Sequence, residues 1–227
     1  MRCKMPHARA LFDQIRRDLE PIHDRLLQHP YLQSLETGQI GREKLRLFAG
    51  EQYAIIASDL RSAAQLVNRF GASASRDFFL GILQGEKAAW DALLAFGSGL
   101  GLTEADLNAH EPMAGAHAYT CYMAWLALYA SDAEVAAAYL VNFPAWGQNC
   151  GRLRRVLTER FGLGEKEVAF FDLFAEPPAT FETNALTIMQ HGLDHGTDAR
   201  LMSRAARLLQ AYELMYWDTL YEASTSR

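Results

Sequence analysis

The spacing of hydrophobic residues predicts α-helices along the whole chain. Apolar side chains recur every three or four residues over long stretches, the period of one helix face, and no alternation typical of a strand persists. We expect helices over residues 6–28, just after 29–30, over 41–70 and over 73–96. Ser73 is predicted to cap the helix that it begins, because serine side chains accept from free amides at helix starts.

The second half of the chain continues the same pattern. A short turn is expected from residue 103, a helix up to 129, and a long helix that Asp132 caps and that runs to 161. Pro144 is predicted to bend or break that helix, because proline lacks an amide donor. Residues 162–178 form a further helical stretch, and 180–223 are expected as one very long helix or two in series. The pattern predicts one all-α domain, residues 1–227, of seven or eight helices.

Composition narrows the possible partners. Half of the 227 residues are hydrophobic, enough for a sizeable core. The 22 basic and 27 acidic residues leave a net charge of -5 without a long basic block, which disfavours nucleic acid as a partner. The longest apolar stretch, residues 118–130, has 13 residues and is shorter than the roughly 18 needed to cross a membrane. With no apolar leader at the start, we expect a cytoplasmic protein.

The three cysteines, Cys3, Cys121 and Cys150, show neither disulfide nor metal spacing. We expect reduced thiols. Either of the last two would be a nucleophile only if a base lay within hydrogen-bonding reach. The alternative is an inert buried thiol.

The segment HGLDHGTD, residues 191–198, concentrates polar side chains. In a continuous helix His191, His195 and Asp198 would share one stripe and could supply three ligands to iron, manganese or zinc. A fourth ligand would come from Glu86 or Glu51 on another helix. The alternatives are half-buried helix residues with ordinary hydrogen-bond partners, or a substrate contact without metal.

Two other segments suggest a pocket for a flat molecule. Glu51, Gln52 and Tyr53 interrupt an apolar helix, where buried polar groups need partners. One interpretation is that all three face a polar pocket. The alternative is that Glu51 and Gln52 are exposed and Tyr53 belongs to the core. Tyr119 and Tyr122 share a helical face and could stack on a heterocycle, or simply fill the core.

Near the end of the chain, Glu213 lies close to Tyr216 and Trp217. Aromatic neighbours would desolvate this carboxylate and raise its pKa, which suits it to proton transfer. Ordinary helix packing is the alternative.

Four segments in order, HPYLQSLETGQIGREKLRLFAGEQYAII, GILQGEKAAWDALLAFGSGLGL, NFPAWGQNCGRL and QAYELMYWDTLYEA, resemble the TenA/thiaminase-II group and its PqqC-like relatives. The resemblance covers about residues 12–223. It implies a heme-oxygenase-like helical bundle with an enclosed pocket, assembled as a homodimer or a larger homo-oligomer. It also implies hydrolysis of amino-pyrimidines in thiamin salvage, by means of a pocket aspartate, aromatic residues, a cysteine nucleophile and a glutamate near the end of the chain.

Residue by residue, the match is incomplete. Glu213 with Tyr216 and Trp217 resembles the family's E-x-x-F-W element, which makes Glu213 the expected general acid. Gln52 stands where the family has the pocket aspartate, and Ala145 stands where it has the cysteine. The resemblance therefore implies attack by water without a cysteine, or a changed substrate. The expected substrate-binding residues are Glu51, Gln52, Tyr53, Tyr119, Tyr122, Trp146 and Tyr216.

The same fold includes metal-dependent oxidases resembling the chlamydial CADD protein, whose last ligand helix carries His-x3-Asp-x2-His. This chain has His191, His195 and Asp198 with the last two types exchanged, and Glu86 is followed seven residues later by Leu93 in place of histidine. A mononuclear iron or manganese site of Glu86 with these three residues is thus one alternative to a hydrolase without a cofactor. A second alternative is a non-catalytic protein that binds a small heterocycle for regulation.

Overall fold

The computed structural model describes residues 7–226, and within them it contains ten α-helices, one short 3-10 helix and no strand. The all-α prediction is confirmed. The helix count exceeds seven or eight because residues 104–108 form a short helix of their own and the last segment is divided in two. The helices are α1 (Ala8–Leu27), α2 (Pro30–Thr37), η1 (Arg42–Lys44), α3 (Leu45–Phe70), α4 (Arg76–Gly99), α5 (Glu104–Asn108), α6 (Ala114–Tyr129), α7 (Asp132–Glu159), α8 (Glu165–Ala175), α9 (Phe181–Asp194) and α10 (Ala199–Thr225).

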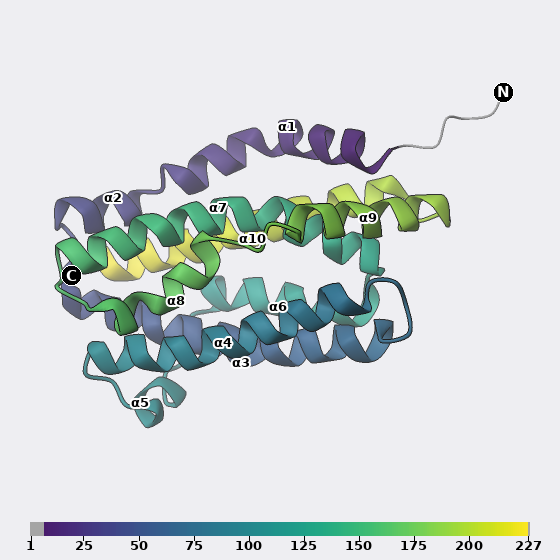
Figure 1. The fold of residues 1–227 in the computed structure, drawn as a ribbon. Helices are drawn as coiled ribbons and strands as arrows, with labels where there is room; N and C mark the ends of the chain where they lie inside the picture. Colours follow the sequence, from purple (N-terminus) through teal and green to yellow (C-terminus); the bar gives the residue numbers. More distant parts are fainter. Residues whose placement is uncertain (1–6, 227) are drawn as a thin grey trace.

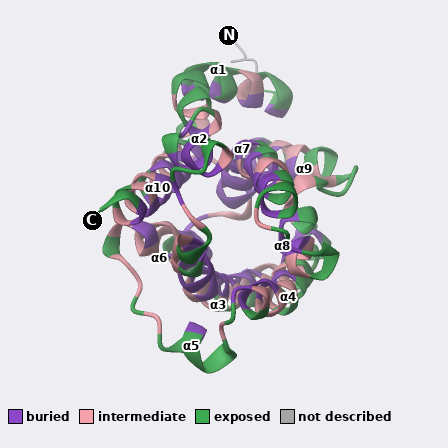
Figure 2. Cartoon of the chain, turned by 90° about the vertical axis from the view of Figure 1, so that its left-hand side faces the viewer, coloured by how far each residue is buried: buried purple, intermediate pink, exposed green. Residues whose placement is uncertain are grey.

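Six helices form a closed ring. In the order α3, α4, α8, α7, α10 and α6, each packs against the next, and α6 returns to α3. Figure 2 shows this ring from one end, and Figure 1 shows that its helices follow the long axis of the molecule. Of the remaining helices, α1 and α2 pack against α7 and α10, and α9 packs against α7 and α1. The ring gives the domain an interior that all six helices can line.

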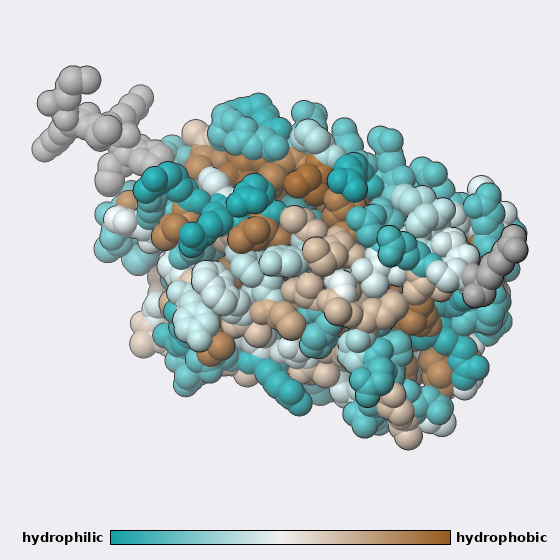
Figure 3. All heavy atoms as spheres, turned by 180° about the vertical axis from the view of Figure 1, so that it is seen from behind, coloured by the Kyte–Doolittle hydropathy of each residue, from teal (hydrophilic) through white to brown (hydrophobic). Residues whose placement is uncertain are grey.

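The first helix, α1, covers one side of the bundle with a single apolar face. Phe12, Ile15 and Leu19 recur at helical spacing and are buried, while most of the residues between them are exposed. Viewed from behind, hydrophobic side chains gather below the upper edge where α1 lies, and hydrophilic ones flank them (Figure 3). None of the helices within residues 7–226 is both long enough and apolar enough to cross a membrane.

Several predicted helix ends differ from the observed ones. The residue before α4 is Ser75, whereas Ser73 closes the preceding turn by donating to the Phe70 carbonyl at 2.9 Å. Ser131, not Asp132, caps α7 by accepting from the backbone amide of residue 134. Pro144 lies within α7, which continues across it, so of the predicted bend or break the break is wrong. Packing of α7 on six neighbouring helices, α1, α2, α6, α8, α9 and α10, holds it in place despite the missing amide.

Candidate functional site

A cavity lies inside the ring of helices. It has about 50 Å³ of free volume, whereas a water molecule needs roughly 10–15 Å³ on the same measure, so it has room for about four waters or one single-ring molecule. Every ring helix contributes to its wall. The lining residues are Gln52, Ile55, Ile56 and Asp59 of α3, Glu86 of α4, Tyr119 of α6, Tyr139, Asn142, Phe143 and Trp146 of α7, Phe174 of α8, and Glu213 and Tyr216 of α10.

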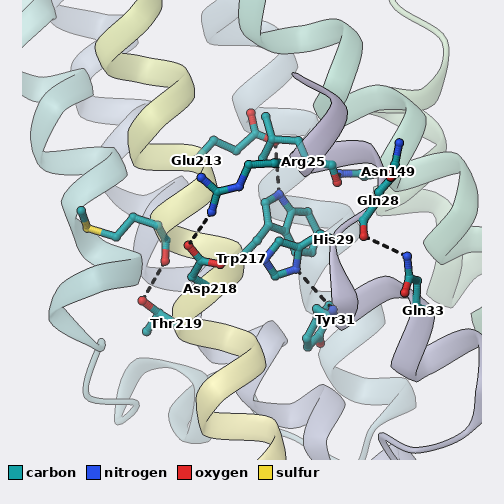
Figure 4. Close-up of polar contacts among 12 residues, drawn as sticks. Arg25, Gln28, His29, Tyr31, Gln33, Asn149, Glu213, Trp217, Asp218 and Thr219 are labelled. Atoms are coloured by element: carbon teal, nitrogen blue, oxygen red, sulfur yellow. Dashed lines mark hydrogen bonds and ion pairs between the residues drawn. The ribbon is translucent and has the colours of Figure 1, made fainter. Parts of the chain in front are cut away.

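Glu213 is the carboxyl with the most complete set of hydrogen bonds in this cavity. Its Oε1 accepts from the indole Nε1 of Trp217 at 3.2 Å, four residues along the same helix (Figure 4), and its Oε2 accepts from Asn142 Nδ2. The side chain is almost fully buried, and burial raises its pKa to about 8 although both hydrogen bonds lower it. At neutral pH this group therefore holds a proton that it can donate, and two donors stabilise the carboxylate that remains.

Asn142 connects Glu213 to the next side chains of the wall. Its Nδ2 also donates to Gln210 Oε1 at 3.1 Å, and its Oδ1 accepts from the Tyr119 hydroxyl at 3.3 Å. Asn142 was not among the predicted site residues, although it is the one polar side chain in the apolar run YLVNF of α7. The network fixes the orientation of the Glu213 carboxyl.

Gln52 and Tyr216 form a second polar pair in the wall. Gln52 Nε2 donates to the Tyr216 hydroxyl oxygen at 2.7 Å, and both side chains are buried. Burial raises the pKa of Tyr216 well above its usual value, so the hydroxyl stays protonated. Because its oxygen accepts from Gln52, its own hydrogen is left to donate to a molecule in the cavity.

Asp59 and Glu86 add two more carboxyls. Asp59 is seven residues beyond Gln52 on α3, about 10 Å of helix rise, and its Oδ1 accepts from Thr120 Oγ1 at 2.5 Å. Burial raises the pKa of Asp59 to about 7. Burial, and then the charge of Asp59, raise the pKa of Glu86 well above its usual value. Asp59 lies within the segment EQYAIIASDL, seven residues after Gln52 and therefore on the same helix face, but it was not among the predicted site residues.

The cavity adjoins a groove on the surface between α4, α8 and α9, with a volume of about 670 Å³. Glu86, Phe143, Trp146 and Phe174 line both spaces. These four side chains therefore form the wall between the cavity and the outside.

A model of the TENA/THI-4/PQQC family matches residues 16–223. The chain belongs to the TENA/THI-4/PQQC family. No curated protein matches its sequence.

Solved structures of TenA homologues have the same fold. A TenA homolog from Pseudomonas syringae pv. tomato has a TM-score of 0.78 at 15% identity, over 92% of each chain. One from Pyrococcus furiosus has a TM-score of 0.72 at 20% identity, over 93% of this chain and all of that one. A Shewanella denitrificans domain with a heme oxygenase-like fold has a TM-score of 0.73 at 11% identity, over 93% and 92%. At these identities the likeness shows the fold alone.

Three predicted binding residues of this TenA-family chain lie outside the cavity. Glu51 is fully buried and accepts from His110 Nε2 at 2.8 Å and from the Met113 amide at 2.9 Å, so it holds the segment before α6. Tyr53 packs on Trp90, and Tyr122 stacks on Trp125. Successive helix residues are rotated by about 100°, so Gln52 alone of residues 51–53 faces the interior.

The predicted metal ligands are not brought together. The helix ends at Asp194, Gly196 adopts a left-handed φ of 90°, and Asp198 begins α10 by accepting from the Arg200 amide. His191 and His195 are exposed and stack on each other, with ring centroids 4.1 Å apart, away from Glu86 in the cavity wall. Within residues 7–226 no three His, Cys, Asp or Glu side chains are grouped for a metal ion. The stripe required one continuous helix, which the glycine interrupts.

The cysteines lie away from the expected nucleophile position. Ala145, where the family resemblance places the cysteine, is fully buried. Cys150 is buried as well, and burial, with the charge of Glu213, raises the pKa of its thiol well above the usual value, which disfavours the reactive thiolate. Cys121 is exposed, and Cys3 lies outside the described residues, as does the predicted helix start at residue 6.

Proposed function

We propose that this TenA-family protein hydrolyses a small amino-pyrimidine-like heterocycle, with Glu213 as the acid and a water molecule as the nucleophile. The observation that carries the proposal is a buried carboxyl, with a pKa that burial raises to about 8, in the wall of the cavity inside the helix ring. A general acid works best when its pKa lies near the working pH. The family resemblance places Ala145 where its members have the cysteine, so we propose a reaction without a covalent intermediate.

The proposed reaction balances with these groups alone. Water attacks the carbon that bears the leaving amino group, forming the C–O bond while the C–N bond breaks. Glu213 gives its proton to the leaving nitrogen, and the attacking water returns a proton to the carboxylate. Trp217 and Asn142 stabilise the anionic form between these two transfers. The proposed reaction needs no metal or other cofactor.

The other cavity residues suit a planar ring. Trp146 and Tyr119 offer aromatic surface against which a heterocycle can pack. The Tyr216 hydroxyl, positioned by Gln52, can donate to a ring nitrogen. Glu51, Tyr53 and Tyr122 have no part in this proposal, because they do not line the cavity.

Ammonia release from a panel of amino-pyrimidines tests the proposal. We expect Glu213→Gln to lower the rate by about 10²–10⁴-fold, the usual contribution of a general acid. Glu222→Gln removes an exposed carboxyl from the same helix and should leave the rate unchanged. Full activity of Glu213→Gln would refute the role of this residue. Ligands that raise the melting temperature without any ammonia release would instead support the non-catalytic binding alternative, which the missing cysteine favours.

We also propose a cytoplasmic homo-oligomer. Trp125, Leu128 and Tyr129 of α6 and Met215 of the adjacent α10 are large apolar side chains that stay exposed, Tyr129 by 70%. A second copy packing on this face would bury them. Sedimentation velocity should show an oligomer for the wild type and smaller species for Leu128→Glu with Tyr129→Glu. An unchanged distribution in this double variant would exclude this face as the interface.

A further inference from the structure

The surface groove outside the cavity wall is mainly apolar. Between α4, α8 and α9 it is lined by residues that include Phe78, Ile82, Leu173, Pro177 and Phe181. Leu173 is 44% exposed, so part of this apolar lining stays in contact with water. A contiguous apolar surface that is open to water is typical of a binding site.

Two glycines leave one side of this groove without side chains. Gly81 and Gly85 are four residues apart on α4, so they lie on the same helix face, and both line the groove. A Cβ atom at either position would meet no atom within 4 Å. Both lie within the regular helix, where no left-handed conformation requires glycine and alanine would be more stable. The two glycines therefore leave free space in the groove at a cost to helix stability.

The groove is continuous with the cavity through one layer of side chains. The four residues that line both spaces are only partly buried, namely Glu86, Phe143, Trp146 and Phe174. Within this layer Trp146 of α7 and Phe174 of α8 meet edge to face, with ring centroids 5.8 Å apart. Side chains with exposed surface change rotamer far faster than helices move. A rotation of either ring would join the two spaces without a change in the helix ring.

The sizes and charges of the two spaces indicate the kind of molecule that fits both. The cavity, with about 50 Å³, holds one ring, whereas the groove, with about 670 Å³, lies within the roughly 300–1,000 Å³ range of small-molecule sites. No lysine, arginine or histidine among residues 7–226 lines the groove, whereas four acidic residues do, Asp77, Glu86, Asp172 and Glu176. An uncharged apolar group therefore suits the groove, and an anionic group does not.

We propose that the groove between α4, α8 and α9 binds an uncharged alkyl chain of the substrate whose ring lies in the cavity. This inference rests on the proposed function, because it names a substituent of the substrate for the same cavity. An alkyl chain is narrower than a second ring, so it can pass between Trp146 and Phe174 after one of them rotates. Binding removes the apolar surfaces of the chain and of the groove from water together.

A series of ligands that differ only in chain length tests the proposal. In 4-aminopyrimidines with an unbranched 5-alkyl chain, from methyl to octyl, the ring stays constant, and isothermal titration gives the Kd of each for the full-length protein. Full burial of one methylene tightens binding about fourfold. Because the groove is open on one side, we expect at least a twofold gain per methylene from propyl onward. An affinity that does not depend on chain length, or no binding by any member, would overturn the proposal.

A charged chain end tests whether the chain is uncharged. An octyl chain that ends in a carboxylate should bind at least tenfold less tightly than the plain octyl chain, because acids line the groove. Equal affinity of the two would overturn this part of the proposal.

Substitution of a groove glycine locates the chain. Gly85→Leu adds a side chain where a Cβ meets no atom within 4 Å, and leucine favours a helix, so the variant should fold at least as stably as the wild type. It should bind the octyl member at least tenfold less tightly and the methyl member as the wild type does. Ala88→Leu adds a side chain at an exposed position of the same helix outside the groove and should keep both affinities. Unchanged octyl binding in Gly85→Leu, or an equal loss in Ala88→Leu, would contradict the location.

Ammonia release separates this inference from the proposed function. A chain-length dependence that Gly85→Leu abolishes, without ammonia release from any member, would refute the proposed hydrolysis alone. Ammonia release with equal Kd values along the series would refute this inference alone.

Discussion

Burial of Glu213 should make the protein less stable as the pH rises. In the unfolded chain this carboxyl has its ordinary pKa of 4.5, whereas in the folded protein burial raises the pKa to about 8. Between these values the folded state keeps the proton that the unfolded state has released. A rise in pH therefore favours unfolding, and the penalty grows from below pH 4.5 until it levels off above about pH 8.

The size of this effect follows from the two pKa values. Each unit of difference corresponds to about 1.4 kcal/mol. Glu213 then costs about 1 kcal/mol of folding free energy at pH 5.5 and about 4 kcal/mol at pH 7.5. The carboxyl is only 3% exposed, so solvent screens little of this cost. Replacement of this carboxyl by an amide, as in Glu213→Gln, removes this cost. The free energy of unfolding should therefore gain about 2–3 kcal/mol more from the substitution at pH 7.5 than at pH 5.5.

Urea unfolding of the wild type and Glu213→Gln at pH 5.5 and 7.5 measures this quantity. The amide meets the two donors Trp217 and Asn142 less well than the carboxyl does, a cost of about 1–3 kcal/mol that is the same at both pH values. The informative quantity is therefore how the difference in unfolding free energy between variant and wild type changes from pH 5.5 to pH 7.5. Other groups titrate alike in both proteins, so their contributions cancel in this difference. Glu222→Gln serves as the control. Parallel pH dependence of Glu213→Gln and wild type, within about 0.5 kcal/mol, would show that Glu213 is ionised in the folded protein at pH 5.5 and would refute the acid role.

Three further predictions concern single contacts. Trp217→Phe removes a donor that lowers the pKa of Glu213, so the alkaline limb of the pH–rate profile should move to higher pH, and an unmoved limb would exclude this contact. Burial lowers the pKa of His29 below 6.5, so the unfolded chain takes up the proton first as the pH falls, and the folded state loses stability. The variant His29→Asn lacks this group. In urea unfolding it should therefore lose less stability than the wild type between pH 7 and pH 5. Gly192→Ala places a Cβ 2.4 Å from a side-chain carbon of α7 and should cost about 1–3 kcal/mol in thermal unfolding, whereas Gly81→Ala, with nothing within 4 Å, should not destabilise the protein.

Local patterns in the sequence were sufficient for the helices and the fold class. Helical periodicity depends on residues a few positions apart, so α1, α3 and α7 were predicted close to their observed ranges. The family resemblance marked Glu213 and Tyr216, and the structure places both in the cavity wall. Helix starts were less accurate, because adjacent serine and aspartate residues can each cap a helix and the choice depends on packing.

The composition of the cavity was decided by the tertiary structure. The sequence of α3 does not show which side of the helix faces the ring interior. In the structure Gln52 and Asp59 line the cavity, whereas Glu51 and Tyr53 do not. Asn142 became a partner of Glu213 only because α7 and α10 pack side by side. The proposed histidine stripe failed for a similar reason: one left-handed glycine between two helices was enough to separate residues that a continuous helix would have aligned.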